Sequence, residues 1–178
     1  SGPLFPEQSY AGIGYARSLD VVDVDFDGCD DLVVGRLYGN VTILFGRGDT
    51  TCSPSIPTDA APAAGPASVA DFDLDGIPDL AAVNPDTNRL QFLRGRGDGT
   101  FAAAQVVQVG DEPRGLAVAD FDLDGFPDVV VSNGESDDVS LVLRDGHGFV
   151  EAGRYAAGKS PGAIAVADFD HDGWPDVV

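Results

Sequence analysis

The chain has 178 residues, and its 30 acidic residues far outnumber its 10 basic ones, giving a formal net charge of −20. It contains no stripe of Lys and Arg that would bind nucleic acid, and no apolar run approaches the length of a membrane span. We therefore expect neither a nucleic-acid partner nor a membrane span.

The first predicted element is a strand at Phe5–Gly14. Its sequence aligns with Phe101–Gly110 and Phe149–Gly158, and both of those segments are expected to hold the last strand of a repeated unit. We therefore expect the chain to open with the last strand of a preceding unit.

An acidic loop follows at Asp23–Asp31 and has the pattern Asp-x-Asp-x-Asp-Gly-x-x-Asp. The pattern recurs at Asp71–Asp79, Asp120–Asp128 and Asp168–Asp176, with starts 48, 49 and 48 residues apart. Four carboxylates within nine residues repel one another unless a hard divalent cation lies among them, and ligands that are all oxygen select calcium over zinc or copper. We predict about four Ca²⁺ ions, one per loop.

Each loop is predicted to surround its ion with carboxylates from positions one, three, five and nine and with the backbone carbonyl of position seven. The glycine at position six permits the sharp turn. The predicted carboxylate ligands are Asp23, Asp25, Asp27, Asp31, Asp71, Asp73, Asp75, Asp79, Asp120, Asp122, Asp124, Asp128, Asp168, Asp170, Asp172 and Asp176. The predicted carbonyl ligands are those of Cys29, Ile77, Phe126 and Trp174.

An EF-hand is the obvious alternative for such a loop. It requires a Glu at position twelve and a helix on either side. Position twelve is Val34, Ala82 and Val131 in the first three loops, and in the fourth it would lie beyond residue 178. The pattern therefore excludes an EF-hand.

The two cysteines lie in the first repeat. Cys29 occupies loop position seven and Cys52 lies nineteen residues before Asp71, and at both positions the later repeats carry apolar residues. A disulfide could replace a contact between these positions, and an even number of cysteines fits an oxidising exterior. We predict a Cys29–Cys52 disulfide, with two separate buried thiols as the alternative.

Two Arg-Gly-Asp tripeptides, Arg47–Asp49 and Arg96–Asp98, fall where we expect turns between a third and a fourth strand. Gly and Asp supply the backbone angles of such turns, and the third repeat has the similar segment Arg144–Gly148 there. We therefore predict turns rather than an adhesion motif. The Pro- and Ala-rich stretch Ser53–Pro66 is predicted to be an irregular outer strand and connector.

The third repeat shows the expected unit most clearly. Strands are predicted at about Gly115–Asp120, Asp128–Ser132, Val139–Arg144 and Phe149–Ala156, and no segment has a 3.6-residue apolar period long enough for a helix. Four antiparallel strands per period of about 40–50 residues are typical of a β-propeller blade. The predicted fold is an all-β propeller.

Three segments also carry a family resemblance: Phe72–Asp79, Phe121–Asp128 and Gly97–Phe101. They resemble the FG-GAP or VCBS repeats of integrin-alpha-like propellers, and the resemblance covers nearly the whole chain. It implies that each calcium loop joins the first and second strands of a blade on one rim. It also implies that ligands bind the opposite face or the clefts between blades, although the family shares no ligand motif that could be carried over.

The chain is expected to cover about three and a half blades. These are the end of a preceding blade at residues 1–15, blades at 16–64, 65–112 and 113–160, and the start of another at 161–178. Propellers close with about four to eight blades, and bare strand edges invite pairing. We therefore expect further blades, from the same parent chain or from a partner chain, to continue the array.

The function predicted from these features is non-enzymatic, because the carboxylate clusters are assigned to metal, and His147 and His171 lie far from any nucleophile pattern. The leading hypothesis is an extracellular module, secreted or on a cell surface, that binds a glycan or an extracellular protein in adhesion or lectin-like recognition. The alternatives are a non-catalytic accessory propeller of a secreted polysaccharide-active enzyme and a structural repeat of a surface adhesin or filament.

Overall fold

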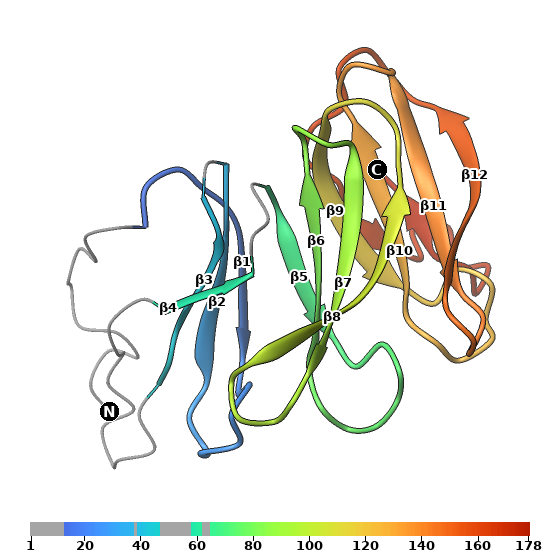
Figure 1. Cartoon of the computed structure of the whole chain (residues 1–178). Coiled ribbons are helices and arrows are strands. Elements are labelled where there is room, and N and C mark those ends of the chain that lie inside the picture. The colour runs from blue at the N-terminus through green and yellow to red at the C-terminus, as the bar shows by residue number, and fades with distance from the viewer. Residues whose placement is uncertain (1–12, 38, 47–57, 62–64) are drawn as a thin grey trace.

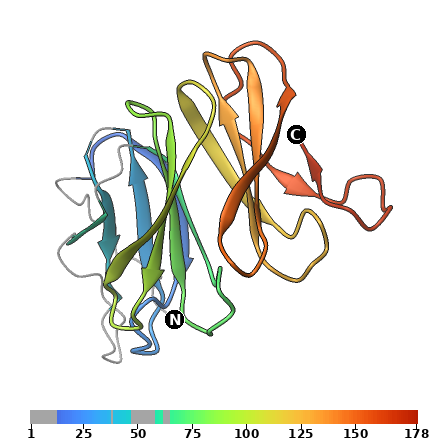
Figure 2. The same cartoon turned by 45° about the vertical axis from the view of Figure 1, so that its right-hand side comes forward.

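The computed structural model describes residues 13–37, 39–46, 58–61 and 65–178, and in these ranges the regular elements are strands. They form antiparallel sheets that follow one another along the chain (Figures 1 and 2). Cys52, the tripeptide Arg47–Asp49 and nearly all of the predicted strand Phe5–Gly14 lie outside the described residues.

Three sheets have four strands each, and in each the spatial order of the strands is their order in the sequence. The first contains β1 (Ala16–Val22), β2 (Asp31–Arg36), β3 (Val41–Leu44) and β4 (Thr58–Ala61). The second contains β5 (Ala67–Ala70), β6 (Asp79–Asn84), β7 (Arg89–Gly95) and β8 (Phe101–Gln108). The third contains β9 (Pro113–Ala119), β10 (Asp128–Asn133), β11 (Asp138–Arg144) and β12 (Phe149–Ala156), and β13 (Val166–Ala167) pairs with β14 (Asp176–Val177) in a two-stranded sheet.

The first strands of successive sheets lie beside one another. β1 contacts β5, β5 contacts β9, and β9 contacts β13, while the fourth strands β8 and β12 contact each other farther out. Figure 1 shows the three larger sheets following one another across the molecule. This arrangement confirms the predicted all-β, propeller-like fold of four-stranded antiparallel blades.

The second strand of each four-stranded sheet is an apolar run rather than an alternating one. β6 is buried from Asp79 to Val83, and all of β10 is buried. A strand covered on both faces is expected to have this composition, and here the neighbouring sheets supply the cover. The predicted strands of the third repeat agree with β9 to β12 within two residues at each end.

Two apolar clusters fill the spaces between the sheets. Between the first and second sheets, Val33 and Ile43 pack with Leu80 and Leu93. Between the second and third, an aromatic group forms where Phe149 stacks on Phe92, with ring centroids 3.3 Å apart and planes 8° apart. Fully burying one such side chain contributes about 1.5–3 kcal/mol. The sheets therefore depend on their neighbours for stability.

Candidate calcium loops

Each acidic loop lies between the first and second strands of its sheet, as the resemblance implied. The loops are loop 1 (residues 23–31), loop 2 (71–79), loop 3 (120–128) and loop 4 (168–176), and the position-nine aspartate of each already belongs to the second strand. The first strands β1, β5, β9 and β13 lie side by side, and we call them the inner row. Each acidic loop begins where a strand of this row ends.

Loop 3 illustrates how aspartates shape the backbone. The Oδ1 atom of Asp120 accepts a hydrogen bond from the amide of Asp124 at 3.1 Å, and its Oδ2 atom accepts one from the amide of Gly125 at 2.9 Å. The amide of Phe126 donates to Asp124 Oδ1 at 2.9 Å. The same three bonds recur in loops 1, 2 and 4, at 2.8–3.2 Å.

The aspartate at position nine ties the loop to the sheet. Asp128 is completely buried, and its two carboxylate oxygens accept bonds from the amides of Phe121 at 2.8 Å and Arg144 at 2.7 Å. Asp31 and Asp79 make the corresponding pairs of bonds. Burial raises the pKa of Asp31 and of Asp128 to about 6, and it raises the pKa of Asp79 as well. A buried carboxylate of this kind is stabilised by a nearby cation.

Three carboxylates converge in every loop, with ligand atoms within 4.8 Å of one another. The converging groups are Asp23, Asp25 and Asp27; Asp71, Asp73 and Asp79; Asp120, Asp122 and Asp128; and Asp168, Asp170 and Asp176. The donor set consists of oxygen, which fits a hard cation such as calcium. The identity of the ion stays a prediction, as does ligation by the carbonyls of Cys29, Ile77, Phe126 and Trp174.

The backbone conformation at loop position four was not predicted from the sequence. Phe26, Leu74, Leu123 and His171 all adopt left-handed φ values between 58° and 63°, and the glycine two residues later has φ between 86° and 94°. Left-handed residues other than glycine cost about 1–2 kcal/mol each, so the aspartate hydrogen bonds hold each loop in a strained turn. The repeated Asp and Gly positions indicate one sharp turn, but nothing in the varied position-four residues indicates a second.

Loops 1 and 2 are each also linked to the next sheet. The position-two carbonyl of loop 1, on Val24, accepts a hydrogen bond from the amide of Gly99 at 3.2 Å. The corresponding carbonyl of loop 2, on Phe72, accepts one from Arg144 Nε at 2.8 Å. In both cases the donor lies at or beside the turn between the third and fourth strands of the following sheet. An ordered loop therefore supports its neighbour as well as its own sheet.

Among the described residues, loop 2 differs from the other loops in containing a cation from its own sheet. The guanidinium of Arg94 lies 3.0 Å from Asp73 Oδ2 and 2.7 Å from Asp75 Oδ2, and the hydrogen bond from Arg94 lowers the pKa of Asp75. The first and third sheets have Phe45 and Leu143 at the position of Arg94. The sequence pattern gave no sign of this pairing.

The remaining predicted features in the described residues can be placed. Arg96–Asp98 lies in the turn between β7 and β8, as predicted, where Asp98 Oδ1 accepts hydrogen bonds from the amide of Thr100 at 3.0 Å and from its hydroxyl at 2.6 Å. Cys29 is buried, with 4% of its surface exposed. Because Cys52 lies outside the described residues, the disulfide stays a prediction.

The third repeat shows what surrounds the position-seven side chain. The guanidinium carbon of Arg144 lies 5.6 Å from the ring centroid of Phe126 and 5.1 Å from that of Phe149. Phe149 itself stacks on the second sheet. The guanidinium of Arg144 therefore packs against both the side chain of loop position seven and the first side chain of the last strand.

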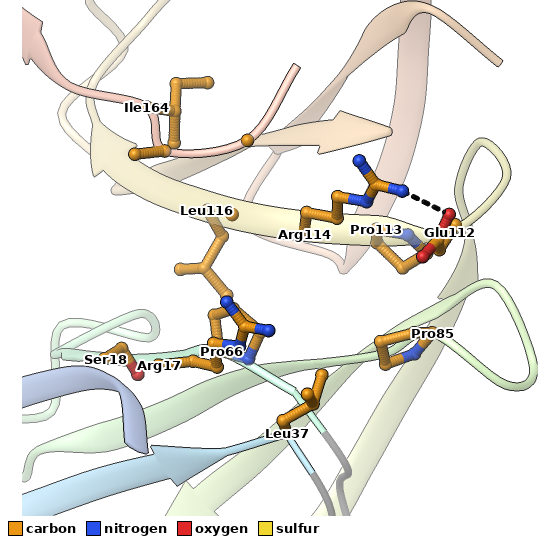
Figure 3. A pocket seen from close by; sticks show the side chains of 13 residues that line it. Arg17, Ser18, Leu37, Pro66, Pro85, Glu112, Pro113, Arg114, Leu116 and Ile164 are labelled. Carbon is orange, nitrogen blue, oxygen red and sulfur yellow. Dashed lines mark hydrogen bonds and ion pairs between the residues drawn. The ribbon is translucent and has the colours of Figure 1, made fainter. Parts of the chain in front are cut away.

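A cavity of about 680 Å³ lies near the other end of the first strands, away from the acidic loops (Figure 3). Its lining includes Arg17 and Ser18 from β1, Arg114 and Leu116 from β9, and Ile164 before β13. This volume is within the range of small-ligand sites. It is the face to which the family resemblance assigned ligand binding.

No helix in the described part of the chain is long and apolar enough to cross a membrane.

Comparison with known proteins identifies one matching family and solved structures of similar fold. No curated protein matches the chain. Among solved structures, the chain is similar to BBS1N from its complex with ARL6DN, soaked with lead, with a TM-score of 0.62, 14% identity and coverage of 92% of this chain and 50% of that one. It is also similar to the V. cholerae biofilm matrix protein Bap1, with a TM-score of 0.51, 18% identity and coverage of 92% of this chain and 28% of that one.

The chain thus spans half the length of the first structure and less of the second. At such low sequence identity, the similarity shows a shared fold only. The FG-GAP-like repeat family matches it three times in succession, over residues 23–82, 71–131 and 120–178. These matches start at the first aspartate of loops 1, 2 and 3, and together they cover most of the sequence. The chain belongs to the FG-GAP-like repeat family.

Proposed function

We propose that this chain is a calcium-stabilised propeller module that recognises a partner outside the cell. The observation that carries the proposal is the repetition of one loop geometry. In all four loops the same aspartate positions bond to the same backbone amides and leave three carboxylates facing one another.

Calcium would supply the charge that this geometry lacks. Asp120, Asp122 and Asp128 would hold the ion in loop 3, with Asp124 as the fourth predicted carboxylate ligand, and the converging carboxylates of the other loops would hold theirs. The aspartates also fix the strained turn, and in loops 1 and 2 the position-two carbonyl accepts a hydrogen bond from the next sheet. Because the ion binds only the ordered loop, its binding energy becomes folding energy.

The binding role is supported by the separation of the loops from the cavity. The loops would brace one end of the inner strands, while the cavity at the other end remains accessible. The cavity lining contains no Cys or His, and Ser18 uses its hydroxyl to accept the amide of Ala67 at 2.8 Å. This lining favours binding over catalysis, so we propose that the described part of the chain is not an enzyme.

The extracellular location is supported by chemistry and by fold. Calcium sites of moderate affinity are filled where calcium is abundant, as it is outside cells. One structure of similar fold is a biofilm matrix protein. The predicted disulfide also requires an oxidising compartment.

Thermal unfolding in calcium and in chelator tests the proposal. We expect calcium to raise the melting temperature, with saturation, and magnesium to do so much less, because magnesium prefers a smaller octahedral site and retains its waters. An unchanged melting temperature after thorough chelation would contradict the calcium role. A glycan array and a pull-down of extracellular proteins, both in calcium, then test partner binding.

A further inference from the structure

Two arginines occupy the same place in two different repeats. Arg17 lies six residues before the first aspartate of loop 1, and Arg114 lies six residues before that of loop 3. The pairing of β1 with β2 shifts register between Ala16 and Ser18, and the pairing of β9 with β10 shifts between Pro113 and Gly115. Each arginine is therefore the extra residue of a β-bulge, a feature that redirects a side chain.

The equivalent residues of the other two repeats are glycines. These are Gly65 before loop 2 and Gly162 before loop 4. Gly162 lines the cavity and has open space where a Cβ would lie, whereas a Cβ at Gly65 would lie 2.6 Å from the carbonyl oxygen of Val83. Arginine thus alternates with glycine at this position along the four repeats.

Both arginines line the 680 Å³ cavity (Figure 3). Arg114 is held by Glu112, whose carboxylate accepts a bond from Arg114 Nη2 at 2.6 Å, and by the hydroxyl of Ser160. The side chain of Arg17 is exposed and makes no hydrogen bond or ion pair with a described residue. The lining holds two arginines and one acid, in a chain where acids outnumber bases 30 to 10. The cavity lining is therefore net positive, whereas the chain as a whole is strongly negative.

The rest of the lining is mainly apolar. The larger aliphatic and proline side chains of its walls are Leu37, Pro66, Pro85, Pro113, Leu116 and Ile164. A sugar would bring many hydroxyls here, and few protein groups are left to pair with them, which is costly. An aliphatic group that carries one carboxylate suits the walls and the arginines together, because a guanidinium matches a carboxylate with two parallel hydrogen bonds.

We propose that this cavity binds a carboxylate presented by an aliphatic segment of a protein partner, with Arg17 as the main anion contact and Arg114 as the pre-positioned second one. The inference rests on the proposed function, since it names the partner chemistry of the same face.

The test uses fluorescent hexapeptides made of Leu, Ile, Val and Pro, with either a free C-terminal carboxylate or an amide. Binding is followed by fluorescence anisotropy on the full chain in calcium. We expect the carboxylate peptides to bind, and Arg17→Gln and Arg114→Gln each to weaken binding by at least about tenfold, because bonds to charged groups are worth that much. Arg96→Gln is the matched control, since it removes the same charge from a turn at the other end of the strands.

Melting temperatures of all variants in calcium show whether each is folded. The proposal is overturned if no carboxylate peptide binds, if amides bind equally well, or if Arg96→Gln weakens binding as much as Arg17→Gln. Binding of uronic-acid oligosaccharides in place of peptides would also overturn it. If calcium stabilises the chain but no peptide binds, this inference alone fails; if calcium has no effect, the calcium role fails whatever the peptides do.

Discussion

Loops 2 and 3 have nearly the same sequence and hydrogen bonds but differ in charge. Both read Phe-Asp-Leu-Asp-Gly-x-Pro-Asp after the first aspartate, and their position-nine aspartates make the same two backbone bonds. Loop 2 contains the guanidinium of Arg94, with 57% of its side-chain surface exposed, whereas loop 3 has no such partner among the described residues. The shape of the loop is therefore independent of how its charge is balanced.

The difference arises from a shift of one residue. In β7 the arginine precedes Gly95, and in β11 the equivalent pair is Leu143 and Arg144. Successive side chains of a strand point to opposite faces. Arg94 therefore reaches the carboxylates of its own loop, while Arg144 bonds to the carbonyl of Phe72 in the preceding sheet. One arginine balances charge and the other joins two sheets.

The largest effect should come from removing a carboxylate in loop 3. Asp124→Ala is expected to lose one calcium ion, because it removes a predicted carboxylate ligand and also the oxygen that accepts the hydrogen bond from the Phe126 amide. With calcium at a hundredfold excess over its dissociation constant, the lost stabilisation is about 3 kcal/mol. Chemical denaturation in calcium measures it. Asp145→Ala, in a turn outside the loop, is the control, and equal losses in the two variants would show that the loop is wrongly assigned.

Loop 1 provides a second contrast, since cysteine replaces the apolar residue of position seven. A disulfide between Cys29 and Cys52 is expected to stabilise the chain by about 3 kcal/mol by restricting the unfolded state. Alkylation without reductant, followed by intact mass, decides whether it forms. Two alkylated thiols would refute the bond.

Arg94→Gln should make loop 2 behave like loop 3. Removing a positive charge beside the proposed ion is expected to raise the calcium affinity of this loop by about tenfold, since a unit charge acts on a divalent ion at short range. In chelator the same change should lower the melting temperature, because the carboxylates lose their partner. Calorimetric titration compares it with Arg89→Gln on the same strand. Identical titrations of the two variants would show that Arg94 has no influence on the ion.

The smallest effect concerns pH and should have opposite signs with and without calcium. Burial raises the pKa of Asp31 and Asp128 to about 6 from a usual 3.8, so the folded chain binds these protons more tightly than the unfolded one. Without metal, stability should therefore rise as the pH falls from about 7 to about 5. With calcium, protons compete with the ion, so stability should fall over the same range. Denaturation at several pH values checks both curves, and parallel curves would contradict the account.

Much of the fold could be read from the sequence because its signals are local and repeated. The Asp and Gly spacing located every loop, and the apolar run from Val129 to Val131 located the buried strand that follows one of them. The left-handed turn at Leu123 was missed because leucine does not favour that conformation. The contact of Arg94 with loop 2 depends on the face of β7 on which Arg94 lies. The spacing of apolar residues does not predict which partner an exposed residue such as Arg94 will contact.

The cavity was unpredictable for a related reason. Arg17 and Arg114 both line the cavity and each lies in a β-bulge, and a register shift leaves little trace in a sequence. Their equivalent positions become visible once the loops are used to align the repeats. An alignment of the repeats on their loops therefore carries the signal for this pair of arginines.

Native mass spectrometry of the calcium-loaded chain tests the central claim most directly. If each loop holds one ion, the spectrum should show successive additions of calcium that stop at four, and Asp124→Ala should stop at three. A chain that retains no calcium, or a variant that still binds the full number, would contradict the account.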